Sequence, residues 1–114
     1  MLIGELSRRT GVSTRLLRYY EAQGVLEAGR GANGYRFYDE DSVVTVRQVR
    51  ALLKGGLSTE VIRVVLPCAR GERPDFEWCA ELWETLNGEL QAMDKRIDDL
   101  QRSRGALAGF LTRP

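Results

Sequence analysis

Apolar residues recur at mostly helical spacing near the start of the chain, with one interruption at Gly11. This pattern predicts a helix over residues 3–10, a tight turn, and a second helix over residues 14–23. Ser13 is placed to cap the second helix by accepting a backbone N–H bond. Gly24 is placed to end that helix, because glycine readily adopts a left-handed conformation.

A glycine-rich stretch and an aromatic segment follow the two helices. The aromatic alternation at residues 35–38 favours an extended strand over a helix. Asn33 and Gly34 form a hairpin turn signal just before this strand. We therefore expect a small β-hairpin here.

Two further helices are expected after the hairpin. The third follows the acidic cluster at residues 39–41, which suits a helix N-terminus, and it stops at the glycines 55–56. Its apolar stripe is formed by Val43, Val46, Val49 and Leu53. The fourth helix begins at the capping residue Ser58 and closes at Pro67, before a polar, loop-like segment at residues 68–75.

The most regular pattern lies in the last segment, where apolar residues fill the a and d positions of a heptad repeat. The a and d positions are Phe76, Cys79, Trp83, Leu86, Leu90, Met93, Ile97, Leu100, Arg104, Leu107 and Leu111, of which only Arg104 is polar. So long a helix cannot bury this seam against a small four-helix head alone, so a partner helix is implied. The simplest partner is a second copy of the chain.

Composition and charge narrow the classes of function. The chain has 114 residues, 43% hydrophobic and 29% charged, which fits one globular domain with an appendage. It has no histidine, which excludes a Ser-His or Cys-His nucleophile within one chain. The formal charge is +3 over residues 1–54 and −2 over residues 55–114, so the front half is the better candidate for binding an anion. With no run of about 18 apolar residues and no secretory signal, we expect a cytoplasmic protein without membrane contact.

Residues 29–34 spell G-x-G-x-x-G, the fingerprint of a loop that cradles a dinucleotide pyrophosphate. A dinucleotide-binding loop needs a buried strand before it, a helix after it, and an acidic residue about 20 positions further on. The sequence offers none of these. We expect instead the tip of a hairpin, which the flanking Arg30 and Arg36 suit to a phosphate backbone. No cofactor is expected.

Steps of 100° along the second predicted helix separate an outward, cationic face from an inward, apolar one. The outward face holds Thr14, Arg15, Arg18, Tyr19 and Ala22, and the inward face holds Leu16, Leu17 and Tyr20. Such a face suits the major groove of DNA, where arginine can donate two hydrogen bonds to guanine or contact phosphate. Taken alone, such a face is more typical of an ordinary solvated helix.

Taken together, these segments resemble the MerR family of winged-helix transcription regulators. The residues that carry the resemblance are Ile3-Gly4-Glu5-Leu6, Thr10-Gly11-Val12-Ser13, Leu17-Arg18-Tyr19-Tyr20-Glu21, Gly24-Val25-Leu26, Gly34-Tyr35-Arg36-Phe37-Tyr38-Asp39 and Gly56-Leu57-Ser58. The resemblance covers residues 1–70 and implies a winged helix-turn-helix DNA-binding domain. It further implies a linker at 71–75 and a dimerisation helix at 76–112 that forms an antiparallel coiled coil. The fold class expected is therefore all-α with a small β-hairpin wing.

The resemblance also implies which residues meet which partners. The expected DNA contacts are Thr14, Arg15, Arg18, Tyr19, Arg30, Arg36 and Tyr38. For Tyr38, phosphate contact and packing beneath the wing remain open alternatives. The expected dimer contacts are Trp83, Leu86, Leu90, Met93, Ile97, Leu100 and Leu107. The partners implied are promoter DNA, which the family bends and untwists, a second copy of the chain, and RNA polymerase as a further candidate.

The signal that would control such a regulator is less defined, and the chain is expected to be a short form without a separate effector domain. Cys68 and Cys79 are the candidate effector residues. Cys79 at a d position is most often a small buried hydrophobe, and the alternatives are a thiol redox pair with Cys68 or a metal ligand. The aromatic residues 76, 78 and 83 suit either a small ligand pocket or the helix seam.

Three other functions stay open at this point. An architectural or recombination-accessory protein would bend DNA without regulating a promoter. A protein-interaction module would use only the terminal helix. An enzyme is the weakest alternative, because it would have to depend on the two thiols.

Overall fold

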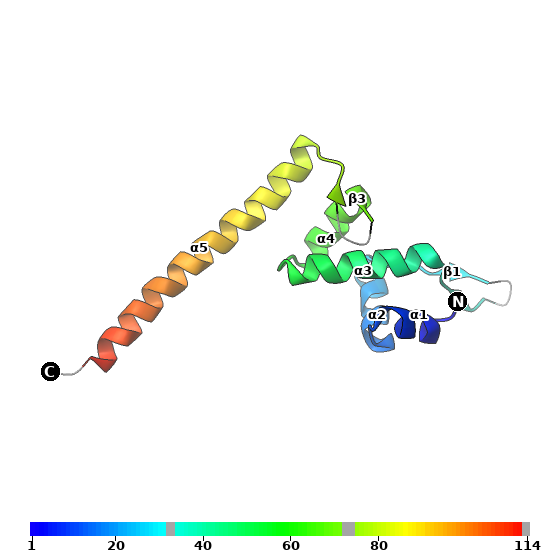
Figure 1. Cartoon of the computed structure of the whole chain (residues 1–114), viewed down its shortest axis with the longest axis horizontal. Helices are drawn as coiled ribbons and strands as arrows, with labels where there is room; N and C mark the ends of the chain where they lie inside the picture. Colours follow the sequence, from blue (N-terminus) through cyan, green and yellow to red (C-terminus); the bar gives the residue numbers. More distant parts are fainter. Residues whose placement is uncertain (32–33, 72–74, 113–114) are drawn as a thin grey trace. The chain divides into compact units, whose positions relative to one another are not determined.

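The computed structural model describes residues 1–31, 34–71 and 75–112. The chain divides into two compact units, a head at Met1–Trp78 and a C-terminal unit at Cys79–Pro114 (Figure 1). Within the described residues, the head holds four α-helices and two short hairpins, and the C-terminal unit holds one long helix. The expected fold class, all-α with a small β-hairpin, is confirmed.

The first two helices form the helix-turn-helix that the sequence predicts. Helix α1 spans Ile3–Thr10 and helix α2 spans Thr14–Ala22. Gly11 ends α1 with a φ of 73°, a left-handed conformation that favours glycine. The Ser13 hydroxyl accepts a hydrogen bond from the backbone N–H of Leu16 at 3.1 Å, so the expected cap of α2 is present.

The expected wing is a two-stranded antiparallel hairpin. Strand β1 spans Gly29–Arg30 and strand β2 spans Arg36–Phe37. At its base, the backbone N–H of Tyr38 donates to the carbonyl oxygen of Met1 at 2.7 Å, which ties the first residue of the chain to the wing. Asn33, part of the expected turn signal, lies outside the described residues.

Two further helices of the head support these elements. Helix α3 spans Glu40–Lys54 and helix α4 spans Thr59–Val65. A reciprocal cap starts α3: Asp39 accepts from the Ser42 backbone N–H at 3.1 Å, and the Ser42 hydroxyl accepts from the Asp39 N–H at 3.2 Å. Helix α3 packs against α1 and α4, and α1 packs against α2 (Figure 1). The fully buried side chains of this core include Leu6, Leu17, Tyr20, Tyr38, Val43, Val46, Val49, Ile62 and Val65.

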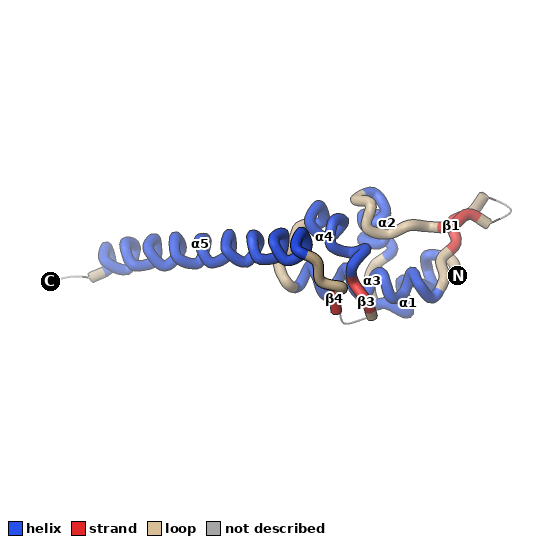
Figure 2. Tube along the Cα trace, turned by 90° about the horizontal axis from the view of Figure 1, so that it is seen from above, coloured by secondary structure: helices blue, strands red, loops and turns tan. Residues whose placement is uncertain are grey.

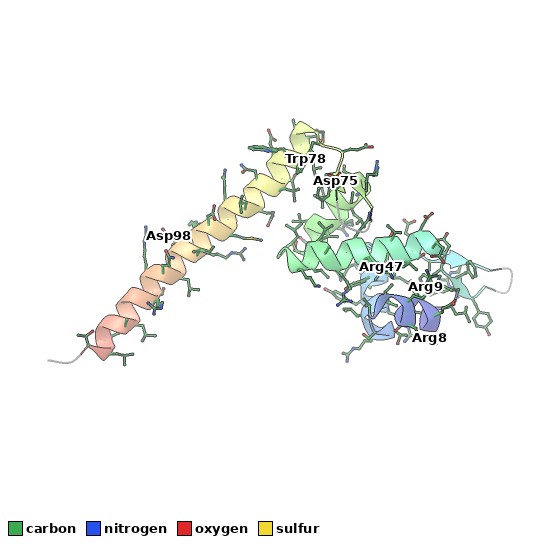
Figure 3. All side chains as sticks on the ribbon, in the orientation of Figure 1. Arg8, Arg9, Arg47, Asp75, Trp78 and Asp98 are labelled. Carbon is green, nitrogen blue, oxygen red and sulfur yellow. The ribbon has the colours of Figure 1, made fainter. Side chains whose placement is uncertain are left out.

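Charged side chains on the surface of the head also link α1 to α3. Arg9 forms a two-pronged ion pair with Glu40, with 2.6 Å between Nη2 and Oε2. Arg47 of α3 donates to the carbonyl oxygen of Arg9 at 3.2 Å (Figure 3). The hydrogen bonds that Arg9 donates to Glu40, together with the positive charge of Arg9, hold the pKa of the Glu40 carboxyl below its usual value. These contacts hold α1 on α3, and α1 in turn supports α2.

Two expected core positions are wrong. Leu16, placed on the inward face of α2, is 40% exposed, and in α3 Leu52 is buried whereas the expected Leu53 is only half-buried. Both expected positions lie at an edge of the apolar stripe on their helix. A helical wheel cannot decide burial at such an edge, because the neighbouring helices determine how far round the helix the core extends.

A second hairpin is the last element of the head, in the region where the sequence suggests a linker. A short 3-10 helix at Leu66–Cys68 leads into strand β3 at Ala69–Arg70, which pairs antiparallel with strand β4 at Asp75–Phe76 (Figure 2). The Gln48 side chain of α3 donates to the carbonyl oxygen of Gly71 at 2.9 Å and anchors this hairpin. Residues 69–70 and 75–76 are therefore held together by β pairing.

The assignment of Phe76 to the dimerisation helix is wrong. Phe76 pairs with Ala69 across the hairpin, and its ring lies 5.6 Å from the ring of Trp78. The heptad spacing continues through position 76 in the sequence, but the backbone there is extended. Periodicity alone cannot locate the start of a helix when the residue before it is apolar for another reason, here packing in a hairpin.

Helix α5 makes up the C-terminal unit as one continuous helix at Ala80–Leu111 (Figure 2). Cys79 is its N-cap, with Sγ accepting from the backbone N–H of Leu82 at 3.4 Å. On its surface, Asp98 and Arg102 form an ion pair of 3.1 Å (Figure 3). Of the helices in the described part of the chain, none is long and apolar enough to cross a membrane.

Candidate nucleic-acid interface

The outward face of α2 carries the predicted basic side chains. Arg15, Arg18 and Tyr19 are exposed, and Thr14 is half-buried. On the opposite face, Leu17 and Tyr20 are fully buried, so α2 cannot rotate without opening the core. The helix therefore presents its cationic and aromatic residues to solvent in one orientation, as the sequence predicts.

The wing adds two arginines to this surface. Arg30 of β1 lies directly opposite Arg36 of β2, and both side chains are exposed. Like charges directly opposite each other in a sheet disfavour the pairing. Arg30 donates to the carbonyl oxygen of Gly34 at 3.3 Å, which holds it against the wing. Two arginines facing each other on a short hairpin suit an anionic partner, because guanidinium groups match phosphate oxygens in charge and shape.

A shallow groove brings the two elements together. It has a volume of about 320 Å³ and is lined by Arg18 of α2 and by Arg30 and Arg36 of the wing. The remaining lining residues are Leu2, Ile3, Gly34 and Tyr35. Three guanidinium groups from separate parts of the chain thus border one surface, which would attract a polyanion.

The glycine-rich stretch forms the bend of the wing. Gly34 has a φ of 82°, and its backbone N–H donates to the carbonyl oxygen of Gly31 at 2.9 Å. The N–H of Gly31 donates to Tyr35 at 3.0 Å, and strand β2 follows. A dinucleotide loop would instead lead into a helix whose N-terminus faces the pyrophosphate. The glycines of this motif therefore serve chain reversal.

Glu21, in the last turn of α2, is the residue of this site that the sequence analysis missed. One carboxylate oxygen, Oε1, accepts a hydrogen bond from the hydroxyl of Tyr38, and the other, Oε2, lies 3.1 Å from Nε of Arg36. The Glu21 side chain is only 14% exposed. One signal was available: a carboxylate in the last turn of a helix is disfavoured by the helix dipole, which indicates a compensating partner.

Tyr38 belongs to the core, and its inclusion among the DNA contacts needs correction. Its side chain is 1% exposed, so the packing alternative is the one that the structure shows. Burial, the hydrogen bond to Glu21 and the charge of that carboxylate, in that order, together raise the pKa of Tyr38 to about 12. The positive charges of Arg36 and Arg18 act against this shift. The phenol is held neutral, as a donor to Glu21.

The two cysteines lie in different parts of the chain. Cys68 ends the short 3-10 helix of the head and is half-buried, whereas Cys79 is exposed at the start of α5. Cys79 is the N-cap of α5 rather than a residue within the helix, because the helix begins one residue later. The described residues contain no group of three or more cysteine, aspartate and glutamate side chains that could hold a metal ion.

The amino-acid sequence matches a known family over most of the head. Residues 1–67 match the profile of the MerR HTH family regulatory proteins. The HTH-type transcriptional regulator HmrR of Sinorhizobium medicae (strain WSM419) is 42% identical over 110 residues, which covers 95% of this chain and 74% of that protein. The nodulation protein NolA of Bradyrhizobium elkanii is 48% identical over 62 residues, but the match spans only 28% of its length.

Two solved structures have a similar fold. The lead(II) complex of the transcription regulator PbrR691 from Ralstonia metallidurans CH34 aligns with a TM-score of 0.80 at 24% identity, over 96% of this chain and 84% of that one. HiNmlR, a MerR family regulator lacking the sensor domain and bound to promoter DNA, aligns with a TM-score of 0.59 at 21% identity, over 96% and 86%. At these identities the structures support the fold, while the family follows from the sequence matches. The chain belongs to the MerR family of helix-turn-helix regulatory proteins.

Proposed function

We propose that this protein is a transcriptional regulator that binds promoter DNA as a homodimer in the cytoplasm. The observation that carries the proposal is the groove where Arg18 of α2 meets Arg30 and Arg36 of the wing. A short helix with an exposed basic face, next to a basic hairpin, is a suitable surface for a DNA backbone and groove. The regulator HiNmlR, which shares the fold, is bound to promoter DNA in its structure.

In this proposal α2 is the recognition helix and enters the major groove. Arg18 and Tyr19 lie in the middle of its exposed face, and Thr14 and Arg15 lie at its N-terminal end. An arginine can donate two hydrogen bonds to O6 and N7 of guanine, so Arg15 and Arg18 are the candidates for reading bases.

The wing contacts the phosphate backbone beside the groove. Arg30 and Arg36 supply charge-assisted hydrogen bonds, which position the protein but carry little sequence information. Binding through such contacts weakens as salt rises, because each neutralised phosphate releases counterions.

Helix α5 supplies the dimer. Its heptad seam is largely exposed within one chain, with Leu90, Ile97, Leu100 and Leu107 each more than half accessible to solvent. A helix with such a stripe needs a partner to bury it. We propose that two copies pair as an antiparallel coiled coil and set their recognition helices in successive major grooves of a pseudo-palindrome. As in the family that the chain resembles, binding would bend and untwist the promoter, and RNA polymerase would be the further partner.

The inducing signal is a separate proposal. Cys68 and Cys79 are the candidate thiols, of which Cys79 is exposed and Cys68 half-buried. Because an oxidant must reach the sulfur atom, the exposed Cys79 is the better placed of the two. Comparing DNA binding with and without a reductant tests this role.

Selection of bound sequences from a pool of random duplexes tests the proposed function. We expect enrichment of a pseudo-palindrome with two equivalent half-sites. Replacing Arg18 by Ala should weaken binding to the selected site by about 1–3 kcal/mol and relax the preference at one position of each half-site, because a bidentate base contact is lost.

Lys54→Ala is the matched control, since it removes one exposed positive charge at the end of α3, outside the predicted DNA contacts. It should change affinity slightly and leave the sequence preference intact. If no duplex is enriched, or if Arg18→Ala binds the selected site as tightly as the unmodified protein, α2 is not the reading helix.

A further inference from the structure

The carboxylate of Glu21 is unfavourably placed unless it has a structural task. It lies in the last turn of α2, where the helix dipole disfavours negative charge. It also pairs with Arg36, one of the three arginines that line the groove that would face phosphates. A negative charge there reduces the attraction of this surface for DNA. Hydrogen-bond donors to the Glu21 carboxylate explain why the negative charge is tolerated there.

Both oxygens of this carboxylate are bound by the wing side of the chain. The Tyr38 hydroxyl donates to Oε1, and Nε of Arg36 lies 3.1 Å from Oε2. Because Glu21 is 14% exposed and Tyr38 is 1% exposed, the link is largely shielded from water, which strengthens charge-assisted hydrogen bonds. One side chain of the recognition helix thus holds the strand β2 and the residue that follows it.

This arrangement leaves the outer end of Arg36 available. Glu21 engages Nε, and the Arg36 side chain is 47% exposed. A guanidinium has a fixed fork of donors, so binding at Nε orients the two terminal nitrogens. Arg30 lies directly opposite and repels Arg36, so without the carboxylate the Arg36 side chain would take up other orientations.

We propose that Glu21 is a positioning residue for DNA binding: it fixes the wing to the recognition helix and aims the Arg36 guanidinium at the phosphate backbone. The inference rests on the proposed function, since it assigns a role within the same DNA-binding surface. The proposal predicts energetic coupling between the two residues, because the contribution of Arg36 to DNA binding depends on Glu21 being present.

A purely electrostatic role and a positioning role of Glu21 predict opposite changes in DNA affinity for the variant Glu21→Gln. If Glu21 acted only as a negative charge, removing it would tighten binding to every duplex, because the surface becomes more positive. If Glu21 positions Arg36, glutamine keeps the shape but loses the charge-assisted bonds, and binding to the selected site weakens. The sign of the change therefore separates the two roles.

The experiment is a double-mutant cycle with Glu21→Gln, Arg36→Ala and the double variant. Dissociation constants are measured for the selected duplex and for a scrambled duplex of equal length. We expect Glu21→Gln to weaken binding to the selected duplex roughly 3- to 10-fold, and Arg36→Ala to have a much smaller effect in the Glu21→Gln background than alone. Tighter binding of Glu21→Gln to both duplexes, or equal effects of Arg36→Ala in both backgrounds, overturns the proposal.

Glu27→Gln is the matched control, because Glu27 is an exposed carboxylate on the loop that follows α2. It removes the same charge and should leave binding unchanged or slightly tighter. Should Glu21→Gln fail to fold, Arg36→Lys replaces it: lysine keeps the charge but lacks the fork, so weaker binding to the selected duplex is expected and unchanged binding overturns the proposal. A failure of the unmodified protein to bind any duplex would instead reject the proposed function itself.

Discussion

Tyr38 joins the wing to helix α2 through a single hydroxyl group. Its ring is buried in the head, and its hydroxyl donates to Glu21. The backbone of the same residue pairs with Met1, so Tyr38 ties together three segments that are distant in sequence. A residue with these contacts should affect stability first and DNA binding only indirectly.

The raised pKa of Tyr38 makes a pH prediction possible. The pKa rises from 10.0 in the unfolded chain to about 12 in the folded protein, so the fold favours the protonated phenol. That contribution to stability is fully present below pH 10 and is lost as the pH rises towards about 12. We expect the free energy of unfolding, measured in urea, to fall between these pH values by about 1.4 kcal/mol per unit of pKa difference.

Tyr38→Phe is the comparison that isolates this residue. It removes the titrating group and the hydrogen bond to Glu21, so it should be less stable at pH 8 by about 1.5–3 kcal/mol. Its stability should then decline less steeply above pH 10 than that of the unmodified protein. Tyr20, whose pKa burial also raises, is present in both proteins and cancels in the difference. Parallel pH curves for the two proteins would contradict the assignment.

At the scale of elements, serine side chains cap the N-termini of α2, the proposed recognition helix, and of α4. Ser13 accepts from Leu16 at 3.1 Å, and Ser58 accepts from Val61 at 3.2 Å. Each satisfies a backbone N–H that the helix leaves without a partner. The two caps are chemically equivalent but lie in helices with different proposed roles, which makes them a matched pair.

Ser13→Ala and Ser58→Ala should each lower the free energy of unfolding by about 0.5–2 kcal/mol, measured by urea denaturation. Under conditions where both variants are fully folded, only Ser13→Ala should weaken binding to the selected duplex. The reason is that fraying of α2 displaces Thr14 and Arg15, whereas α4 takes no part in the proposed interface. Equal losses of DNA affinity in the two variants would argue against α2 as the recognition helix.

The elements of the helix-turn-helix were predictable because their signals are local. Helical periodicity, the cap at Ser13 and the glycine at 11 each act within a few residues, and all three agree with α1 and α2 as observed. The second hairpin was not predictable in this way. Its pairing of Ala69 with Phe76 and its anchor on Gln48 depend on contacts that no local pattern records.

At the scale of the whole molecule, α5 is the proposed source of dimerisation. Leu86 and Leu90 occupy successive d and a positions of its seam, half-buried and 56% exposed respectively within one chain. Replacing both by Lys would place four positive charges in the seam of the proposed dimer. We expect sedimentation equilibrium to show a monomer, with weaker DNA binding because one recognition helix alone makes too few contacts.

The matched control is the double variant Gln91→Lys and Ala92→Lys. It adds the same charge to the same helix at exposed positions outside the seam. This variant should still sediment as a dimer and bind DNA as the unmodified protein does. A dimer in both double variants would remove the seam as the interface.

The sequence by itself determined the helices of the helix-turn-helix, the hairpin nature of the wing and the seam of α5. Each of these follows from short-range geometry: helical or strand periodicity, a capping side chain, or a glycine that allows the chain to turn. The basic face of α2 could be read in the same way, because helix geometry alone places Arg15, Arg18 and Tyr19 together.

Only the tertiary structure decided where each element meets another. It placed Tyr38 in the core, joined Glu21 to Arg36, exposed Leu16 and moved the start of α5 to Ala80. These outcomes depend on which surfaces pack together and which charges become shielded. A one-dimensional pattern does not contain that information, because burial and charge pairing are set by residues far apart in the chain.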